Sequence, residues 1–338
     1  MRYRDAGVDI ARADQVKEAI TAAVRGTWTQ AVRALPGGFA GVIEWPGGPP
    51  LLAATMDGVG TKLHLALEAG RVGDAAADLV YHGADDLLVH GARPLAFLDY
   101  IAQSQLDAQV VLEVVQGLSR ACAEVGAALL GGETAQMPDT YLPGVVDVAG
   151  CMLGVVMPGQ LLGVSAARPG DRLLGLGSSG LHTNGYSLAR KILATSGLDR
   201  RAPLPGGRGE SLEDALLAPH RWYGPALTPA IEAGRVRALA HVTGGGIAGN
   251  LERVLPEGSR AQVDGSAWSR PALFRWLMAA GRVPEDDARQ AFNLGIGMIV
   301  VCAPQEADAL ARDLERAGES VWPLGDVVAG ERGVAWKS

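Results

Sequence analysis

The sequence predicts a two-domain α/β or α+β protein, and three observations carry this prediction. Apolar segments of strand length alternate with segments of helical periodicity along both halves of the chain. A length of 338 residues leaves room for two domains of ordinary size. The turn dipeptide Pro169-Gly170 lies near the middle, so we place the boundary within residues 158–170 and expect domains at 1–160 and 168–338.

The first half alternates predicted helices and strands. Apolar residues at helical spacing predict helices over residues 13–25, 74–90 and 108–126. Between and after them lie segments typical of strands: LPGGFAGVIEW, which begins with a turn, PPLLAATMDG, GARPLAFLDYIA, AALLGGET and VVDVAGCMLGVVMP. The last segment is rich in valine and alanine, as expected of a buried strand.

The second half continues this alternation. A helix is expected after HTNGYS (residues 182–187), and further helices over 247–255 and 306–318. Strands are expected to end at AHVT (residues 240–243) and to cover 297–303 and 321–328. APLPGGRGES is typical of a loop.

Composition and charge exclude several classes of protein. Hydrophobic residues make up 48% of the chain and charged residues 20%, so extensive disorder is not expected. A net charge of −7 argues against nucleic-acid binding, which requires a basic face. Cys122, Cys151 and Cys302 have no metal-binding spacing, so we expect reduced thiols in a cytoplasmic protein. The start of the chain does not resemble a signal peptide, and no run reaches the roughly 18 apolar residues of a membrane span.

The segment DGVGTK follows the predicted strand PPLLAATM and joins two glycines to a threonine and a lysine. A P-loop has lysine directly after its last glycine, whereas Thr61 separates Gly60 from Lys62, so this segment is not a P-loop. Asp57 at the strand end, followed by Gly58, suits a carboxylate that holds Mg²⁺ while the lysine contacts phosphate. A tight Asp-Gly turn without a ligand is the alternative.

The predicted helix over 74–90 places Asp78, His82 and Asp86 four residues apart, and therefore on one face. Asp85 adds a further carboxylate. A solvated helix face is one interpretation. The other is a site for a metal or a magnesium nucleotide, because the surrounding residues are apolar.

Two further segments place polar residues beside glycines. Glu133 and Thr134 follow two glycines in LLGGETAQMP, where a backbone can approach a ligand closely and the acid adds charge. GLGSSGLHTNGYS places His182, Thr183 and Asn184 before a helix, where amides and hydroxyls suit a phosphate. An ordinary strand exit and a capped helix with an incidental histidine are the respective alternatives.

HVTGGGIAGN contains the pattern G-x-G-x-x-G, formed by Gly244, Gly246 and Gly249. Three consecutive glycines, with Gly245 between the first two, produce such a match by chance, and the flanking βαβ pattern is missing. Phosphate contact at the start of the following helix is therefore favoured over dinucleotide binding. Nothing in the sequence has the G-x-S-x-G pattern of a serine hydrolase.

Taken in order, these segments resemble the phosphoribosylformylglycinamidine cyclo-ligase family, also called aminoimidazole ribonucleotide synthetases. The most specific matches are DGVGTKLHLA, GGETAQMP, GSSGLHTNGYSLARKIL, HVTGGGIAGNLERVLP and FNLGIGMIVV, and the resemblance runs from about residue 3 to residue 328. It implies an N-terminal sheet domain that pairs with that of a second subunit to close a barrel. A C-terminal α/β domain packs beside it, and ATP and substrate bind in the cleft between the domains.

The resemblance also implies a reaction in purine biosynthesis, in which formylglycinamidine ribonucleotide and ATP give aminoimidazole ribonucleotide, ADP and phosphate. Asp57, Asp86 and Asp78 are then the candidates for holding Mg²⁺ or K⁺ against the phosphates. Lys62 is expected to neutralise γ-phosphate charge. Gly58, Gly60, Thr61, Glu133 and Thr134 are expected to complete the metal and phosphate shell.

Further contacts are implied in the second half. His182 and Asn184 are expected to position substrate or move a proton during ring closure. The loop with His241 and the glycines 244–246 is expected to receive a phosphate on its amides, and Asn293 to lie in the same cleft. The substitutions Asp57→Ala and Lys62→Ala are expected to abolish turnover and leave the fold intact.

The chain departs from the family pattern at several positions. Asp85 stands where the family usually has asparagine, which adds a charge beside the expected metal, and Gln136 where it usually has glutamate. Tyr81 and His82 replace small and sulfur-containing residues. These changes either tune metal preference or mark a paralogue with another substrate. The alternatives are a related ATP-dependent enzyme, such as a selenophosphate synthetase or a thiamine-phosphate kinase-like enzyme, and a non-catalytic nucleotide sensor of the same fold.

Overall fold

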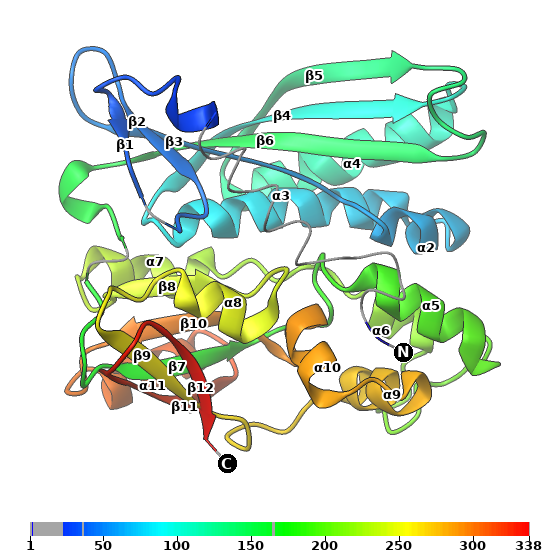
Figure 1. Ribbon diagram of the computed structural model, residues 1–338. Helices are drawn as coiled ribbons and strands as arrows, with labels where there is room; N and C mark the ends of the chain where they lie inside the picture. The colour runs from blue at the N-terminus through cyan, green and yellow to red at the C-terminus, as the bar shows by residue number, and fades with distance from the viewer. Residues whose placement is uncertain (1, 3–22, 36, 164–165, 338) are drawn as a thin grey trace.

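The computed structural model describes residue 2 and residues 23–35, 37–163 and 166–337. In this part of the chain there are two six-stranded sheets, each packed against helices (Figure 1). Strands of the first sheet come from residues 32–156 and those of the second from residues 172–337. The prediction of an α/β protein with a sheet in each half is confirmed. Most of the helix predicted over 13–25 lies outside the described residues.

The first sheet has the order β1-β2-β3-β6-β4-β5. Its strands are β1 (Val32–Arg33), β2 (Gly41–Glu44), β3 (Leu51–Gly58), β4 (Arg93–Gln103), β5 (Ala128–Gln136) and β6 (Val146–Val156). β4 and β5 are parallel, and the other neighbouring strands are antiparallel. Residues of β6 alternate between buried and half-buried, as a strand with one face on a core requires. β5 lies at the edge, and most of its residues are exposed.

Three helices cover one face of this sheet: α2 (Lys62–Glu68), α3 (Val72–Leu88) and α4 (Ala108–Val125) (Figure 1). α4 begins after Asp107, whose carboxylate caps its first amides, and ends at Gly126 in the left-handed conformation. α3 and α4 approach closely because Gly73 and Gly117 lack side chains. A Cβ atom on Gly117 would lie 1.9 Å from the carbonyl oxygen of Gly73.

The second sheet has the order β12-β9-β11-β7-β10-β8. Its strands are β7 (Arg172–Gly177), β8 (Ala238–His241), β9 (Ser259–Asp264), β10 (Ile296–Cys302), β11 (Val321–Ala329) and β12 (Gly333–Lys337). β12 is parallel to β9, and the other pairs are antiparallel. β8 and β10 are buried along their whole length, which places them in the core.

Seven α-helices accompany this sheet in the described residues: α5 (Tyr186–Ser196), α6 (Leu212–Leu216), α7 (Gly224–Glu232), α8 (Gly246–Glu252), α9 (Ala272–Gly281), α10 (Glu285–Ala291) and α11 (Ala307–Arg316). A 3₁₀ turn, η2 (Pro158–Gln160), follows β6. None of the helices described combines the length and apolar character that crossing a membrane requires. Cys122, Cys151 and Cys302 are free thiols, as predicted.

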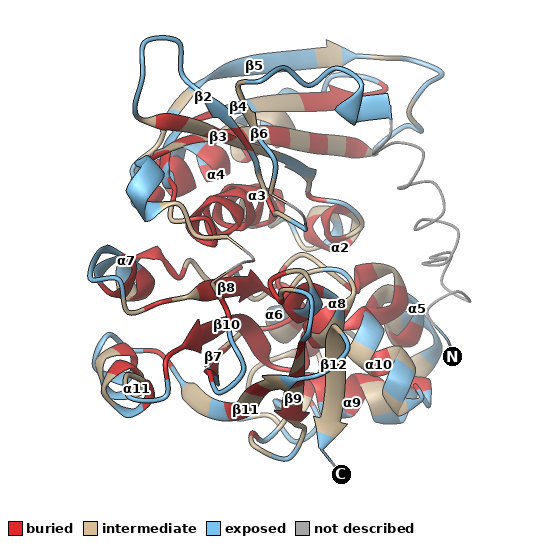
Figure 2. Ribbon diagram, turned by 60° about the vertical axis from the view of Figure 1, so that its left-hand side comes forward, coloured by how far each residue is buried: buried red, intermediate tan, exposed pale blue. Residues whose placement is uncertain are grey.

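α3 lies between the first sheet and the second half of the molecule (Figure 2). It is buried without interruption from Ala75 to Leu88, because the sheet and α4 cover one side and residues of the second half cover the other. The polar residues of α3 are therefore held at the junction of the two halves, where the candidate site lies.

Candidate functional site

The acidic residues predicted on residues 74–90 are buried in α3. Asp78, Asp85 and Asp86 have exposed fractions of 1%, 0% and 7%, so the interpretation as a solvated helix face is wrong. A carboxylate in this environment needs a partner, because burying it alone is costly. The partners come from β3, from α2 and from loops of the second half.

Asp57 and Asp86 converge on His82. Asp57 ends β3, and its Oδ2 atom lies 2.9 Å from Nε2 of His82. The same nitrogen is 3.7 Å from Oδ2 of Asp86. The other ring nitrogen, Nδ1, lies 2.6 Å from Oγ1 of Thr183 in the second half. One nitrogen of His82 thus faces two carboxylates, while the other is held by the predicted HTNGYS segment.

Three histidines of the second half complete a cluster around this point. His241, at the end of β8, places Nδ1 2.8 Å from Oδ1 of Asp86 and Nε2 3.2 Å from Nε2 of His220. His220 stacks on His182, with ring centroids 4.1 Å apart. His182 has a left-handed backbone with φ of 59°. Gly297 leaves room for its ring, since a Cβ atom there would lie 2.5 Å from Cε1 of His182.

The pKa values of the four imidazoles shift in different directions. Burial lowers the pKa of His82, but the neighbouring carboxylates, Asp86 first among them, outweigh burial and raise it above its usual value. Burial holds the pKa of His182 and of His220 well below the usual range. Burial also lowers the pKa of His241, although Asp86 opposes this. The surroundings thus favour the protonated form at His82 and the neutral form at the other three rings.

Asp85 is completely buried, which raises the pKa of its carboxyl group well above the usual value. Its Oδ1 accepts a hydrogen bond from the amide of Tyr223 (3.1 Å), and its Oδ2 lies 3.4 Å from Nε2 of His220. Burial thus opposes the negative charge that the sequence led us to expect beside Asp86.

A cavity of about 240 Å³ opens beside this cluster. It is lined by residues 57–61, by His82 and by residues 183–187. The strand end predicted to hold metal and phosphate therefore lies across the cavity from the HTNGYS segment. Thr61 and Ser187 approach each other across it, with their hydroxyl oxygens 3.2 Å apart.

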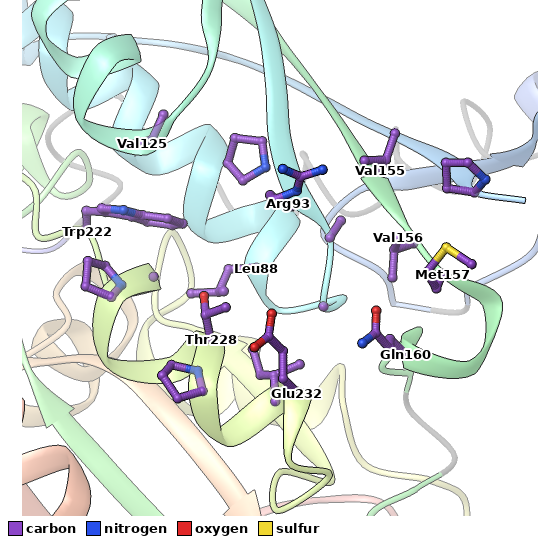
Figure 3. A pocket seen from close by; sticks show the side chains of 18 residues that line it. Leu88, Arg93, Val125, Val155, Val156, Met157, Gln160, Trp222, Thr228 and Glu232 are labelled. Atoms are coloured by element: carbon purple, nitrogen blue, oxygen red, sulfur yellow. The ribbon is translucent and has the colours of Figure 1, made fainter.

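A larger cavity, of about 530 Å³, lies at the C-terminal end of α3 (Figure 3). Its lining is mainly apolar, and Figure 3 shows Leu88, Val156 and Trp222 among the side chains around it, with Arg93 and Glu232 as charged members. None of the site residues predicted from the sequence lines it. Its size alone therefore gives it no link to the predicted chemistry.

Lys62 and Asp78 pair with each other and not with the other predicted ligands. Both side chains are 1% exposed and form an ion pair. The Lys62 ammonium group also donates to the carbonyl oxygens of His182 (3.2 Å) and Ala218 (3.0 Å), while Asp78 accepts from the amide of His220 (2.7 Å). This arrangement separates Lys62 from the cavity and Asp78 from the pair formed by Asp57 and Asp86.

The glycine loop before α8 lies beside Asn184. A Cβ atom on Gly244 would lie 3.2 Å from Oδ1 of Asn184. Gly245 and Gly246 have φ values of 93° and 65°, a conformation that glycine adopts without strain. The side-chain Nδ2 of Asn250 holds the loop by donating to the carbonyl oxygens of Gly244 and Gly246. The predicted phosphate loop and the HTNGYS segment are thus neighbours.

Asn293 is occupied within the second half. Its Nδ2 donates to the carbonyl oxygen of Gly180 (2.9 Å), and its Oδ1 accepts from Oγ of Ser178 (3.0 Å) and the amide of Gly295 (2.9 Å). The residue is 4% exposed. These contacts fix the turn that carries His182, so Asn293 supports the site without lining the cavity.

Glu133 and Thr134 lie apart from Asp57 within one chain. Across the sheet, Glu133 on β5 lies opposite Tyr100 on β4. Tyr100 lies opposite Ala149 on β6, and Ala149 lies opposite Gly58 on β3. Three strand spacings separate Glu133 from Gly58, about 14 Å in total. Both Glu133 and Thr134 are exposed on the edge strand.

The sequence did not identify two members of the cluster as site residues. His82 was noted on the acidic face of its helix but received no role. His220 stands in LLAPHRWYG, outside every motif, and only the fold brings it beside His182 and His241. Its spacing in the sequence contains no signal that could have found it.

Comparisons with known proteins agree across the whole chain. Residues 37–156 match the family "AIR synthase related protein, N-terminal domain", and residues 168–337 match the corresponding C-terminal domain. Phosphoribosylformylglycinamidine cyclo-ligases of Cupriavidus pinatubonensis and Cupriavidus necator are each 43% identical over 329 residues, covering 97% of this chain and 93% of theirs. The crystal structure of thiamine-monophosphate kinase from Stenotrophomonas maltophilia superposes with a TM-score of 0.67 at 20% identity, covering 93% of both chains.

Proposed function

The chain belongs to the family of AIR synthase related proteins, and from this premise we propose that it is an ATP-dependent cyclo-ligase of purine biosynthesis. It converts formylglycinamidine ribonucleotide and ATP into aminoimidazole ribonucleotide, ADP and phosphate. The 43% identity to relatives of that name over nearly the whole of both chains is the observation that carries the proposal. The likeness to the kinase from Stenotrophomonas maltophilia supports the fold alone.

Ring closure needs activation because an amide oxygen is a poor leaving group. The formyl oxygen attacks the γ-phosphorus of ATP, forming an imidate phosphate and releasing ADP. A substrate nitrogen then attacks the activated carbon, the five-membered ring closes, and the C–O bond breaks to release phosphate. Phosphoryl transfer depends on charge neutralisation and positioning more than on covalent help from the protein.

Asp57 and Asp86 are the residues that would hold a divalent cation, and their two carboxylates facing one imidazole nitrogen fit that purpose. A bound cation would neutralise phosphate charge during the transfer. Gly58, Gly60 and Thr61 line the same cavity, and the amides of Gly60 and Thr61 would contact phosphate oxygens, since the amide of Gly58 donates to Oδ1 of Asp57. Lys62 does not line the cavity. It would support the site indirectly, since its buried ion pair with Asp78 and its hydrogen bond to His182 hold the start of α2 against the loop of His182.

Asn184 and Thr183 line the opposite wall of the cavity and would orient the substrate. The ring-closing nitrogen loses a proton. His182 does not line the cavity, so it would accept this proton through a group that does; burial favours its neutral imidazole, and its Nδ1 has no hydrogen-bond partner among the described residues. The adjoining loop of glycines 244–246 is placed to receive the substrate phosphate.

The protein acts as a cytoplasmic homodimer in this account, with the first sheet as its interface. The exposed edge strand β5 and the exposed apolar side chains of Met56, Leu98 and Leu130 on that sheet support this assignment. Glu133 and Thr134 lie apart from Asp57 within one chain. Pairing of two such sheets would bring them to the site of the second subunit.

The test is turnover with ATP, Mg²⁺, K⁺ and formylglycinamidine ribonucleotide, with ADP and aminoimidazole ribonucleotide followed together. Equal amounts of both products are expected. ADP release without the aminoimidazole would assign the protein to a phosphoryl transferase acting on another acceptor. Binding of ATP with neither product would indicate a nucleotide sensor.

A further inference from the structure

Two imidazole nitrogens share the candidate cation site with the two carboxylates. We propose that Asp57, His82, Asp86 and His241 together bind a first-row transition-metal dication in preference to Mg²⁺. This inference rests on the metal role proposed above for Asp57 and Asp86, and it specifies the ion. Imidazole favours zinc-like cations, whereas Mg²⁺ prefers a shell of oxygen ligands.

The donor atoms lie close enough to share one ion. One atom from each of His82, Asp86 and His241 lies within 4.8 Å of the other two. Asp57 is not one of these three; it is the fourth candidate ligand through its contact with His82, whose Nε2 lies 2.9 Å from its Oδ2. The two oxygens of Asp86 face different rings, Oδ2 toward His82 and Oδ1 toward His241. Two nitrogens and two carboxylates form a donor set suited to tetrahedral Zn²⁺.

Each ring is also held by its second nitrogen, as metal-ligating histidines in proteins usually are. Nδ1 of His82 lies 2.6 Å from Oγ1 of Thr183, which can accept its proton. Nε2 of His241 lies 3.2 Å from Nε2 of His220. When Nδ1 of His82 donates to Thr183, its Nε2 is free to bind a cation beside the carboxylates of Asp57 and Asp86.

Charge and access favour the same conclusion. Asp57 and Asp86 bring two carboxylates to the same imidazole nitrogen, and carboxylate oxygens are ligands for a dication. Asp57 and His82 line the 240 Å³ cavity, and the Asp57 side chain is 46% exposed, so an ion can enter from solvent.

The other histidine group in the described residues, formed by His182, His220 and His241, is less suited to an ion. The rings of His182 and His220 stack at 4.1 Å with planes 27° apart. Nitrogen lone pairs lie in the ring plane, so stacked rings direct them side by side and not to a common point. His220 serves instead to hold His241.

The test is metal binding by the full-length protein without ATP or substrate, so its outcome is independent of turnover. Equilibrium dialysis with Zn²⁺, followed by metal analysis, is expected to give one ion per chain, retained in excess Mg²⁺. Co²⁺ bound at the same site is expected to show the visible absorption of a four-coordinate ion. His82→Met should weaken Zn²⁺ binding by at least about 10–100-fold. The matched control His64→Met, on α2 outside the cluster, should bind as the wild type.

Asp57→Asn provides a second variant in case His82→Met does not fold, because Asp57 is partly exposed. It is expected to lose Zn²⁺ affinity and the Co²⁺ absorption. Equal Zn²⁺ affinity in wild type, His82→Met and Asp57→Asn would overturn the proposal. It would also be overturned if the folded wild type bound no Zn²⁺, or if Mg²⁺ displaced Zn²⁺ at comparable concentration.

Discussion

The Lys62 ammonium group and the Asp78 carboxylate form an ion pair that is almost completely removed from solvent. Both residues belong to the first half of the chain, yet the ammonium group also donates to the carbonyl oxygens of His182 and Ala218 in the second half. The pair therefore joins the two halves next to the histidine cluster. We therefore expect loss of Lys62 to destabilise the fold, whereas the sequence alone led us to expect an intact fold.

Lys62→Met should destabilise the protein by about 3–5 kcal/mol, because it leaves the Asp78 carboxylate buried without its partner. The free energy of unfolding from urea titrations measures this. The matched control Lys337→Met removes the exposed pair with Asp326 and should cost less than about 1 kcal/mol. Equal stability of Lys62→Met and wild type would show that the pair does not join the halves.

Glu285 at the start of α10 should make the stability of the fold depend on pH. The hydrogen bond from Arg270, together with the charges of Arg270 and Arg289, outweighs burial and holds the pKa of Glu285 below its usual value of 4.5. A lowered pKa contributes stability that is present above pH 4.5 and lost as the pH falls through the folded-state value. Glu285→Gln should thus cost no more than about 1 kcal/mol at pH 7, given partial exposure.

The difference in unfolding free energy between Glu285→Gln and wild type should shrink as the pH falls below 4.5. Thermal or urea unfolding across pH 3–7 measures it. Glu257→Gln, at an exposed position, is the control and should show little difference at any pH. A difference that stays constant across the range would mean that the carboxylate charge is not its cause.

Leu130→Lys tests the proposed dimer. Leu130 lies on the edge strand β5 and is 65% exposed, so a lysine there should leave the fold of one subunit intact. Light scattering coupled to size exclusion is expected to give a dimer for the wild type and a monomer for the variant. Leu198→Lys, on an exposed leucine of the second half, should remain dimeric. A dimeric Leu130→Lys would place the interface elsewhere.

Asp57→Asn should lower kcat by at least about 100-fold, because one of the two carboxylates proposed to hold the cation loses its charge. Its partial exposure predicts a change in unfolding free energy within about 1 kcal/mol. Asp308→Asn, an exposed aspartate on α11, is the matched control. Activity of Asp57→Asn near that of the wild type would remove Asp57 from the mechanism.

The sequence predicts long elements well, since their periodicity is strong. α4, β3 and β6 lie within segments identified in advance, and α3 begins and ends two residues before the helix predicted over 74–90. Short helices such as α2 and α6, with seven and five residues, are too brief to show a helical period, and they were missed. β7 was also missed, because its glycines at 175 and 177 resemble a turn.

The candidate site was predicted in part. Strand ends and glycine segments identified Asp57, Thr61 and Asn184 as candidates, the family resemblance implied a common cleft, and all three line one cavity. The pairing of Lys62 with Asp78 was not foreseen. The sequence assigned the lysine to a phosphate and the aspartate to a metal, whereas the structure pairs the two with each other. Burial decides such roles, and burial depends on contacts between halves that no local pattern contains.

The most direct test of the proposed chemistry follows the formyl oxygen. Formylglycinamidine ribonucleotide labelled with ¹⁸O at the formyl group is turned over with ATP, and the released phosphate is examined by mass spectrometry. Activation by phosphorylation predicts that each phosphate carries one ¹⁸O atom, because the formyl oxygen leaves with it. Unlabelled phosphate, with ¹⁸O found in water, would contradict the imidate phosphate and the account built on it.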